Sequence, residues 1–306
     1  MPNLTKNILA TVCYYNILDY PLTSFEIWKY LMKSGEQDEG DHKRSLADVL
    51  EKLENGALAN FIEEFQGFYF LKGKQELVEK RIARGKISVM KIKKLRRVIW
   101  ILRFVPFVRM IGVTGRLAMK NAQEKSDWDL LVVLKYGKIW TGRTLVTLAT
   151  HFLGKRRYGH KIKDRVCLNH FITNKSLKIK IRDLFSANEY YFCFPIFGSL
   201  EYKRFQIKNR WIKKFKPDYE IAEADNLKML KDTKFSRAVR KFLEIIFDWN
   251  FLENWLRILE TKKIKNNPKT HQKGSLIDIS DEALIFLPSP QGPKVFERFK
   301  ERISEL

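Results

Sequence analysis

The stretch that decides the fold is MIGVTGRLAMKNAQEKSDWDLLVVL, residues 110–134. An apolar run predicted to be a strand leads into Gly115, a short helix is expected next, and Asp127 and Asp129 open a second apolar strand. Because residues i and i+2 of a strand point to the same side, the two carboxylates are expected to project together. A glycine where a strand turns into a helix lets backbone approach a phosphate. The pattern predicts a phosphate beside a divalent cation, and paired carboxylates favour Mg²⁺.

This order of elements resembles the nucleotidyltransferase superfamily, in which a strand, a Gly-Ser pair and an Asp-x-Asp strand follow one another. The segments VCLNHFIT (166–173) and NRWIKKFKPD (209–218) resemble a prokaryotic group of this superfamily with an N-terminal winged helix. The resemblance implies a polymerase-beta-like fold, a nucleoside triphosphate substrate, and Asp127 and Asp129 as catalytic metal ligands. The residues assigned to the nucleotide are Gly115, Arg116, Ser126 and Arg143.

Two positions depart from the family pattern. Arg116 stands where the family has a serine that helps to hold the triphosphate, so it either replaces the hydroxyl with a forked cationic donor or blocks the pocket. The family's third acid is expected on the strand 165–173, where Asn169 is the best candidate for a third metal ligand. An amide cannot act as a general base. Strand alternation sends His170 to the opposite face, and Asp164 is a more distant option.

Residues 1–72 are predicted to form a winged-helix domain of three helices and a hairpin. Thr23 and Glu26 have the spacing of a capping box at the start of the second helix. The third helix is expected near 41–55 and carries acids as well as basic residues, so DNA binding and protein packing are equally supported. The basic residues near its start are His42, Lys43 and Arg44.

The rest of the chain divides into three predicted parts of an α/β (α+β) protein. Residues 73–106 are expected to be a basic helical connector, 107–220 the nucleotidyltransferase-fold domain with a mixed sheet flanked by helices, and 221–306 a helical C-terminal region. The basic loop 155–157 is expected to contact phosphate or solvent. The stretch 202–216 has no acid and interleaves aromatic with basic residues, which indicates a nucleic-acid surface or buried packing.

Charge and cysteine content narrow the class of protein. The chain has 58 Lys and Arg residues against 35 Asp and Glu residues, a formal charge of +23. Such an excess attracts nucleotide, nucleic acid or anionic lipid, or keeps the surface soluble. The apolar window 98–113 is too short and charged to span a bilayer, and the N-terminus lacks a signal-peptide pattern. We expect buried free thiols and a cytoplasmic protein without a membrane partner.

Two hypotheses about function follow from these patterns. The first is a Mg²⁺-dependent nucleotidyltransferase that moves a nucleoside monophosphate from an NTP to an unidentified acceptor. The second is a catalytically weakened nucleotidyltransferase fold that acts as a nucleotide- or nucleic-acid-binding regulator through its winged helix. The first is favoured because the phosphate turn and the metal pair are both present.

Overall fold

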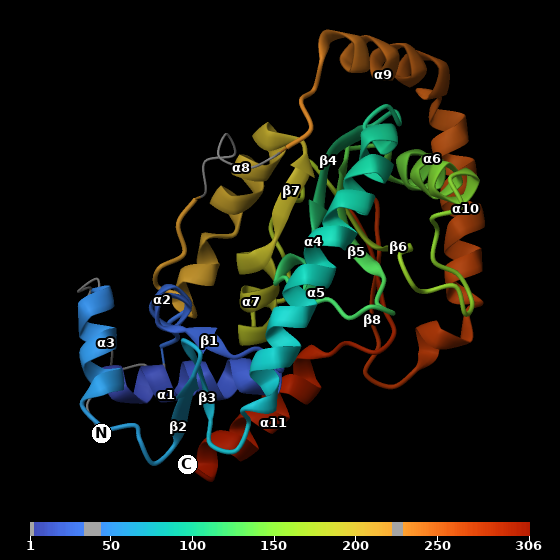
Figure 1. Ribbon diagram of the computed structural model, residues 1–306. Coiled ribbons are helices and arrows are strands. Elements are labelled where there is room, and N and C mark those ends of the chain that lie inside the picture. Colours follow the sequence, from blue (N-terminus) through green and yellow to red (C-terminus); the bar gives the residue numbers. More distant parts are fainter. Residues whose placement is uncertain (1–2, 34–43, 222–228) are drawn as a thin grey trace.

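A six-stranded mixed sheet forms the centre of the computed structural model, which describes residues 3–33, 44–221 and 229–306 (Figure 1). Its strands lie in the order β7-β4-β5-β6-β9-β8. β5 and β6 are parallel, and the other neighbouring pairs are antiparallel. The strands are β4 (Val108–Val113), β5 (Trp128–Leu134), β6 (Val166–Thr173), β7 (Phe194–Phe197), β8 (Leu276–Ile279) and β9 (Ala283–Leu287). The expected mixed α/β class is confirmed.

The apolar sequence of β5 explains its place inside the sheet. All its residues from Leu130 to Leu134 are buried, as expected for an uninterrupted apolar strand with both faces covered. Alternate side chains enter two separate cores: Leu130 belongs to one and Leu131 to the other. The same alternation places Asp129 on the Leu131 side of the sheet.

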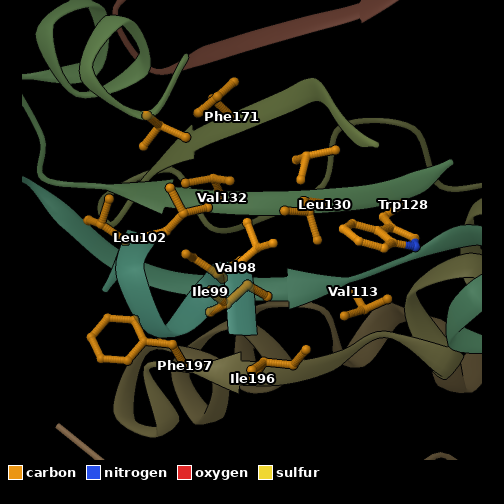
Figure 2. Packing of buried hydrophobic residues seen from close by; sticks show 14 of the residues in the cluster. Val98, Ile99, Leu102, Val113, Trp128, Leu130, Val132, Phe171, Ile196 and Phe197 are labelled. Atoms are coloured by element: carbon orange, nitrogen blue, oxygen red, sulfur yellow. The ribbon is translucent and has the colours of Figure 1, made fainter. Parts of the chain in front are cut away.

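Two helices cover the Leu130 face of the sheet, α4 (Glu76–Leu102) and α6 (Ile139–Phe152). The predicted connector is thus one continuous helix whose last turns belong to the main core. Apolar side chains at helical spacing on α4 meet the sheet, which explains why this basic helix lies against it. The side chains in this core include Val98, Ile99, Leu102, Leu130 and Val132 (Figure 2).

The opposite face is covered by α7 (Leu184–Phe192), α8 (Ser199–Lys208) and the 3₁₀ helix η1 (Arg210–Lys214). Tyr202 and Phe205 of the basic stretch point into this second core and are buried. These two rings are therefore not available to stack on bases. The packing interpretation of the stretch 202–216 is confirmed for both rings.

The N-terminal unit contains the three expected helices and the hairpin, with one further strand in an order β1-β3-β2. Its second helix begins at the predicted capping box, in which Glu26 N–H donates to Thr23 Oγ1 at 3.2 Å and Thr23 N–H donates to Glu26 Oε2 at 3.1 Å. His42 and Lys43 lie outside the described residues. The elements are α1 (Asn3–Ile17), β1 (Leu22–Thr23), α2 (Ser24–Lys29), α3 (Leu46–Glu54), β2 (Ile62–Phe65) and β3 (Phe68–Leu71).

The C-terminal region is not wholly helical, so this part of the prediction is wrong. It begins with α9 (Lys234–Phe247), α10 (Asn250–Lys265) and the 3₁₀ helix η3 (Pro268–His271). The hairpin of β8 and β9 then extends the main sheet beside β6. The apolar run of β9 after a polar turn is a strand signal that helical periodicity does not reveal. Finally α11 (Gly292–Ser304) packs against α1.

The structure bears on the predicted state of the cysteines and on the predicted lack of a membrane-spanning segment. Cys13, Cys167 and Cys193 are buried free thiols, as expected. Within the described ranges, no helix combines enough length with enough apolar character to cross a membrane. The apolar window 98–113 is instead divided between the end of α4 and β4.

The docking of α11 on α1 can be tested at one aromatic contact. The rings of Phe299 and Tyr14 meet edge to face, with centroids 5.6 Å apart. Phe299→Ala is expected to lower the free energy of unfolding by about 1–3 kcal/mol, because it removes a half-buried ring from this contact. Phe296→Ala, at an exposed position of the same helix, is the matched control and should change it by less than about 0.5 kcal/mol. Denaturant unfolding followed by circular dichroism measures both, and equal losses would contradict the docking.

Candidate metal and nucleotide site

One buried lysine of α4 fixes the loop that precedes β5. Lys91 Nζ donates to the backbone carbonyls of Glu124 and Ser126, each at 2.9 Å, and to Asp164 Oδ1 at 2.8 Å. Its side chain is only 4% exposed, so these acceptors compensate for the loss of water around the ammonium group. Lys91 therefore holds the chain in place immediately before Asp127.

Asp127 and Asp129 lie together with Cys167 of β6. One ligand atom from each of the three side chains lies within 4.8 Å of the other two. The strand register explains this, because Asp129 pairs directly with Cys167 across the parallel strands. The structure thus brings the two predicted carboxylates together and adds a thiol that was not predicted to belong to the site.

The prediction of Asn169 as the third ligand assumed unbroken alternation along β6. The pairing with β5 shifts by one residue between Cys167 and His170, which is a β-bulge. A bulge reverses the side taken by the side chains that follow it. His170 therefore lies on the same side as Cys167, where its Nδ1 is 3.1 Å from Tyr190 Oη, and the prediction that it faces away is wrong. Cys167, in place of Asn169, stands opposite Asp129.

Gly115 brings the predicted phosphate turn against the acidic pair. It begins the short helix α5 (Gly115–Ala118) with a left-handed φ of +65°. A Cβ atom at this position would lie 2.8 Å from Asp129 Oδ2, closer than such contacts allow. Glycine is therefore required both by the backbone conformation and by the close approach of the carboxylate.

Burial and neighbouring carboxylates oppose the ionisation of Asp129 and of Cys167. The pKa of Asp129 is raised to about 6, first by burial and then by the neighbouring carboxylate of Asp127. The pKa of Cys167 is raised to about 12, first by burial and then by both carboxylates. Cys167 is therefore a neutral thiol at physiological pH and donates its S–H to Asp129. Two repelling carboxylates without a shared cation are a destabilising arrangement that a metal ion would relieve.

Arg157 supplies positive charge directly at the cluster. Its Nη1 donates to Asp127 Oδ2 at 2.5 Å and contacts Cys167 Sγ at 3.5 Å. The backbone N–H of Arg157 donates to the carbonyl of Val166 at 3.0 Å, which attaches the basic loop to the start of β6. The side chain is 42% exposed, so it is free to leave Asp127 when another cation binds there.

A further carboxylate approaches the cluster from α7. The pKa of Glu189 is raised to about 7, first by burial and then by Asp129 and Asp183. Within the part of the chain that the structure describes, no residue donates a hydrogen bond to its carboxylate or forms an ion pair with it. The third ligand was predicted on a strand, so Glu189, which lies on a helix, was not among the predicted site residues. The available signal was a single acid within the otherwise uncharged helix sequence LFSANEYYF.

The other predicted nucleotide residues have different surroundings. Arg116 is exposed, and none of the residues placed by the structure accepts a hydrogen bond from its guanidinium group. Ser126 Oγ donates to the carbonyl of Gln123 at 2.8 Å, so the hydroxyl stabilises its own turn. Arg143 of α6 forms an ion pair with Glu260 of α10, and its charge stabilises the contact between these two helices.

Two alternative acid–base residues have structural roles. Burial opposes the ionisation of Asp164, but hydrogen bonds from Lys91 at 2.8 Å and Lys94 at 2.7 Å outweigh it and lower the pKa of Asp164. Burial lowers the pKa of His170 to about 4, so its imidazole is neutral. Neither residue has the properties of a general base at the cluster.

No protein-family model, curated protein or solved structure matches the chain. The cluster of Asp127, Asp129 and Cys167 beside Gly115 is therefore the feature from which a function can be inferred. Its geometry combines two carboxylates and a thiol with a left-handed glycine turn that lies directly against Asp129.

The close approach at Gly115 can be tested by a single methyl group. Gly115→Ala is expected to displace Asp129 and to weaken binding of Mn²⁺, used as a spectroscopic substitute for Mg²⁺, by about tenfold or more. Gly137→Ala is the matched control, because Gly137 also has a positive φ, of +75°, but nothing lies within 4 Å of its Cβ position. Calorimetric titration measures both variants. Wild-type affinity in Gly115→Ala would contradict the proposed contact.

The raised pKa of Asp129 can be tested through the free energy of unfolding of the protein. Asp129→Asn is expected to stabilise the metal-free protein at pH 8 by on the order of 2 kcal/mol, because it removes a buried, repelled charge. The raised pKa means that the folded state penalises the ionised form, so the penalty is complete above about pH 6 and absent below the ordinary value of 3.8.

The difference between Asp129→Asn and the wild type should therefore disappear towards pH 4. Thermal unfolding in the presence of a chelator, at pH 8 and at pH 4, measures this dependence. A wild type that is more stable than the variant at pH 8 would show that Asp129 is not destabilised in the folded protein.

Proposed function

We propose that this chain is a Mg²⁺-dependent nucleotidyltransferase that moves a nucleoside monophosphate from an NTP to an unidentified acceptor. The observation that carries the proposal is the convergence of Asp127 and Asp129, within 4.8 Å, against the left-handed turn at Gly115. Transfer of this kind needs a cation held by carboxylates and a place where phosphate oxygens can approach it. The glycine turn and the acidic pair meet both needs.

The donor chemistry of the cluster fits Mg²⁺. Asp127 and Asp129 would hold the ion through carboxylate oxygens and leave its remaining positions to water and phosphate. In the metal-free protein, burial and then both carboxylates raise the pKa of Cys167 to about 12, so its thiol stays neutral until a metal ion displaces its proton. When bound, the ion would neutralise triphosphate charge and polarise the reacting phosphorus.

Glu189 is suited to accept the proton of the attacking hydroxyl group. Its pKa of about 7 matches the requirement for a general base near neutral pH. Because no described residue hydrogen-bonds to its carboxylate, its oxygens are available to a hydroxyl group of the acceptor. Glu189 would thus supply from a helix the carboxylate that β6 lacks.

Two arginines are placed to bind the triphosphate. Arg116 directly follows Gly115 and is exposed, so its forked guanidinium group would replace the serine hydroxyl of the family motif. Arg157 would lose Asp127 as its partner when a cation binds there, and its guanidinium group would then be available to phosphate oxygens.

We propose that the N-terminal unit is a winged helix used for packing within the protein. Its surface at α3 and β2 would repel DNA phosphates, because it exposes Glu51, Glu54, Glu63 and Glu64. The unit is also attached to the rest of the chain by buried polar contacts. Tyr15 Oη donates to Asn188 Oδ1 at 2.6 Å, and Lys216 Nζ donates to the Tyr30 carbonyl at 3.0 Å. These contacts favour the enzyme over a DNA-binding regulator.

The proposal predicts separate roles for the acids. The wild type should bind Mg²⁺ with a non-hydrolysable NTP analogue and release pyrophosphate from an NTP when a suitable acceptor is present. The double variant Asp127→Asn, Asp129→Asn should lose both properties. Glu189→Gln should bind the Mg²⁺–analogue complex normally but lower turnover by about 10²–10⁴-fold, because it lacks the base.

Glu297→Gln on α11 is the control for loss of a carboxylate elsewhere, and it should behave as the wild type. Calorimetry measures binding, and a coupled assay measures pyrophosphate. A wild-type protein that does not bind the Mg²⁺–analogue complex would overturn the proposal. Unchanged turnover in Glu189→Gln would remove Glu189 from it.

A further inference from the structure

Helix α9 turns its polar side towards the body of the protein. Arg240 donates to the Arg103 carbonyl at 2.9 Å and pairs with Asp232 at 2.7 Å. One turn further along, Glu244 pairs with Arg109 at 2.7 Å and accepts from the Phe107 backbone N–H at 3.0 Å. These specific bonds fix the orientation of α9 about its axis, so the opposite side of the helix must face outwards.

The outward side of α9 is apolar, with residues at helical spacing. Phe235, Phe242 and Ile245 are 70%, 64% and 75% exposed. The apolar surface continues past the end of the helix, because Trp249 and Phe251 are 66% and 77% exposed. Figure 1 shows α9 at the edge of the molecule, away from the N-terminal unit. Such a concentration of large exposed apolar side chains marks an interaction surface.

The apolar side of α9 also extends towards the C-terminal end of α4. The ring of Phe235 lies 6.1 Å from that of Phe104, which in turn lies 5.7 Å from Trp100, between centroids. Trp100 is 50% exposed. We call these residues and the outward side of α9 the apolar face: Trp100, Phe104, Phe235, Phe242, Ile245, Ile246, Trp249 and Phe251.

Among the residues that the structure describes, the unpaired charges beside the apolar face are basic. The exposed cations of α9 are Lys234, Arg237 and Lys241. The acids of the same segment are engaged with the body of the protein, because Asp232 pairs with Arg240, Glu244 with Arg109 and Asp248 with Lys138. Large aromatic and aliphatic side chains beside Lys and Arg residues that pair with no described acid therefore characterise this surface.

We propose that the apolar face binds the surface of an anionic lipid bilayer, with α9 lying in the plane of the interface. Its 14 residues give a helix of about 21 Å, long enough to lie along headgroups but too short to cross a bilayer. Aromatic and aliphatic side chains enter the boundary between headgroups and acyl chains, while Lys234, Arg237 and Lys241 contact lipid phosphates. A second copy of this chain would bring the same basic residues together, which opposes self-association here.

This proposal is independent of the proposed nucleotidyl transfer and differs from the expectation of no membrane partner, which rested on the lack of a spanning segment. The full chain is tested by co-sedimentation with two kinds of vesicle. One contains phosphatidylcholine alone, and the other contains phosphatidylcholine with about 30% phosphatidylglycerol, an anionic content that gives a strong negative surface potential. We expect binding to the anionic vesicles only, weakened by salt.

Two sets of variants separate the apolar and the electrostatic contributions. Phe242→Glu with Ile245→Glu should abolish vesicle binding, whereas Leu200→Glu, at a 72% exposed position of α8, is the matched control and should bind as the wild type does. Each of Lys234→Ala, Arg237→Ala and Lys241→Ala should weaken binding by about fivefold. Circular dichroism verifies that each variant is folded.

Quenching of tryptophan fluorescence by brominated lipid reports whether the apolar face enters the bilayer. Trp249 lies on the apolar face, so Trp249→Phe should reduce the quenching of tryptophan fluorescence on anionic vesicles. A folded wild-type protein that does not bind anionic vesicles would overturn the proposal. So would a dimer that the Phe242→Glu, Ile245→Glu variant converts to a monomer, because the apolar face would then be a surface between copies of the chain. Equal binding by that variant and Leu200→Glu would also overturn it.

Discussion

The candidate site depends on two carboxylates that lie close together where the buried strand β5 begins. Asp127 directly precedes β5 and Asp129 is its second residue, and one carboxylate oxygen of each lies within 4.8 Å of the other. Two neighbouring side chains partly offset the repulsion between the carboxylates. The guanidinium group of Arg157 donates to Asp127, and the neutral thiol of Cys167 donates to Asp129. No described residue replaces the divalent charge that two carboxylates can hold. The pKa of Asp129, which burial and Asp127 raise to about 6, is the physical reason for proposing a cation at this cluster.

The surrounding fold positions this pair from three directions. Lys91 of α4 fixes the loop before Asp127, and the left-handed turn at Gly115 makes room for Asp129. Helix α7 brings Glu189 towards the same side of the sheet. The apolar face at α9 has a separate origin, because its orientation is determined by polar contacts such as the pair of Glu244 and Arg109. The two features can therefore be altered independently.

Much of this arrangement was predictable from local patterns. Apolar runs predicted β4, β5 and β6, the capping box at Thr23 predicted the start of α2, and alternation predicted the convergence of Asp127 and Asp129. The β-bulge in β6 was not predictable, because an inserted residue leaves no mark in the apolar pattern, and it changed the side of the sheet on which His170 lies. Glu189 was not predicted, because the contact of α7 with the sheet joins segments that are far apart in the sequence. The strands β8 and β9 were not predicted, because a short apolar segment has the same pattern in a strand as in a buried helix.

The most direct test of the central claim is a titration of the metal-free protein with Mn²⁺, followed by the electron paramagnetic resonance signal of the free ion. We expect saturable binding to the wild type and its loss in the variant with Asp127→Asn and Asp129→Asn, because the carboxylates of the cluster would be the ligands. We also expect tighter binding when Arg157→Ala removes the competing cation. Absence of saturable binding, or binding that survives the double substitution, would contradict the assignment of this cluster as a metal site.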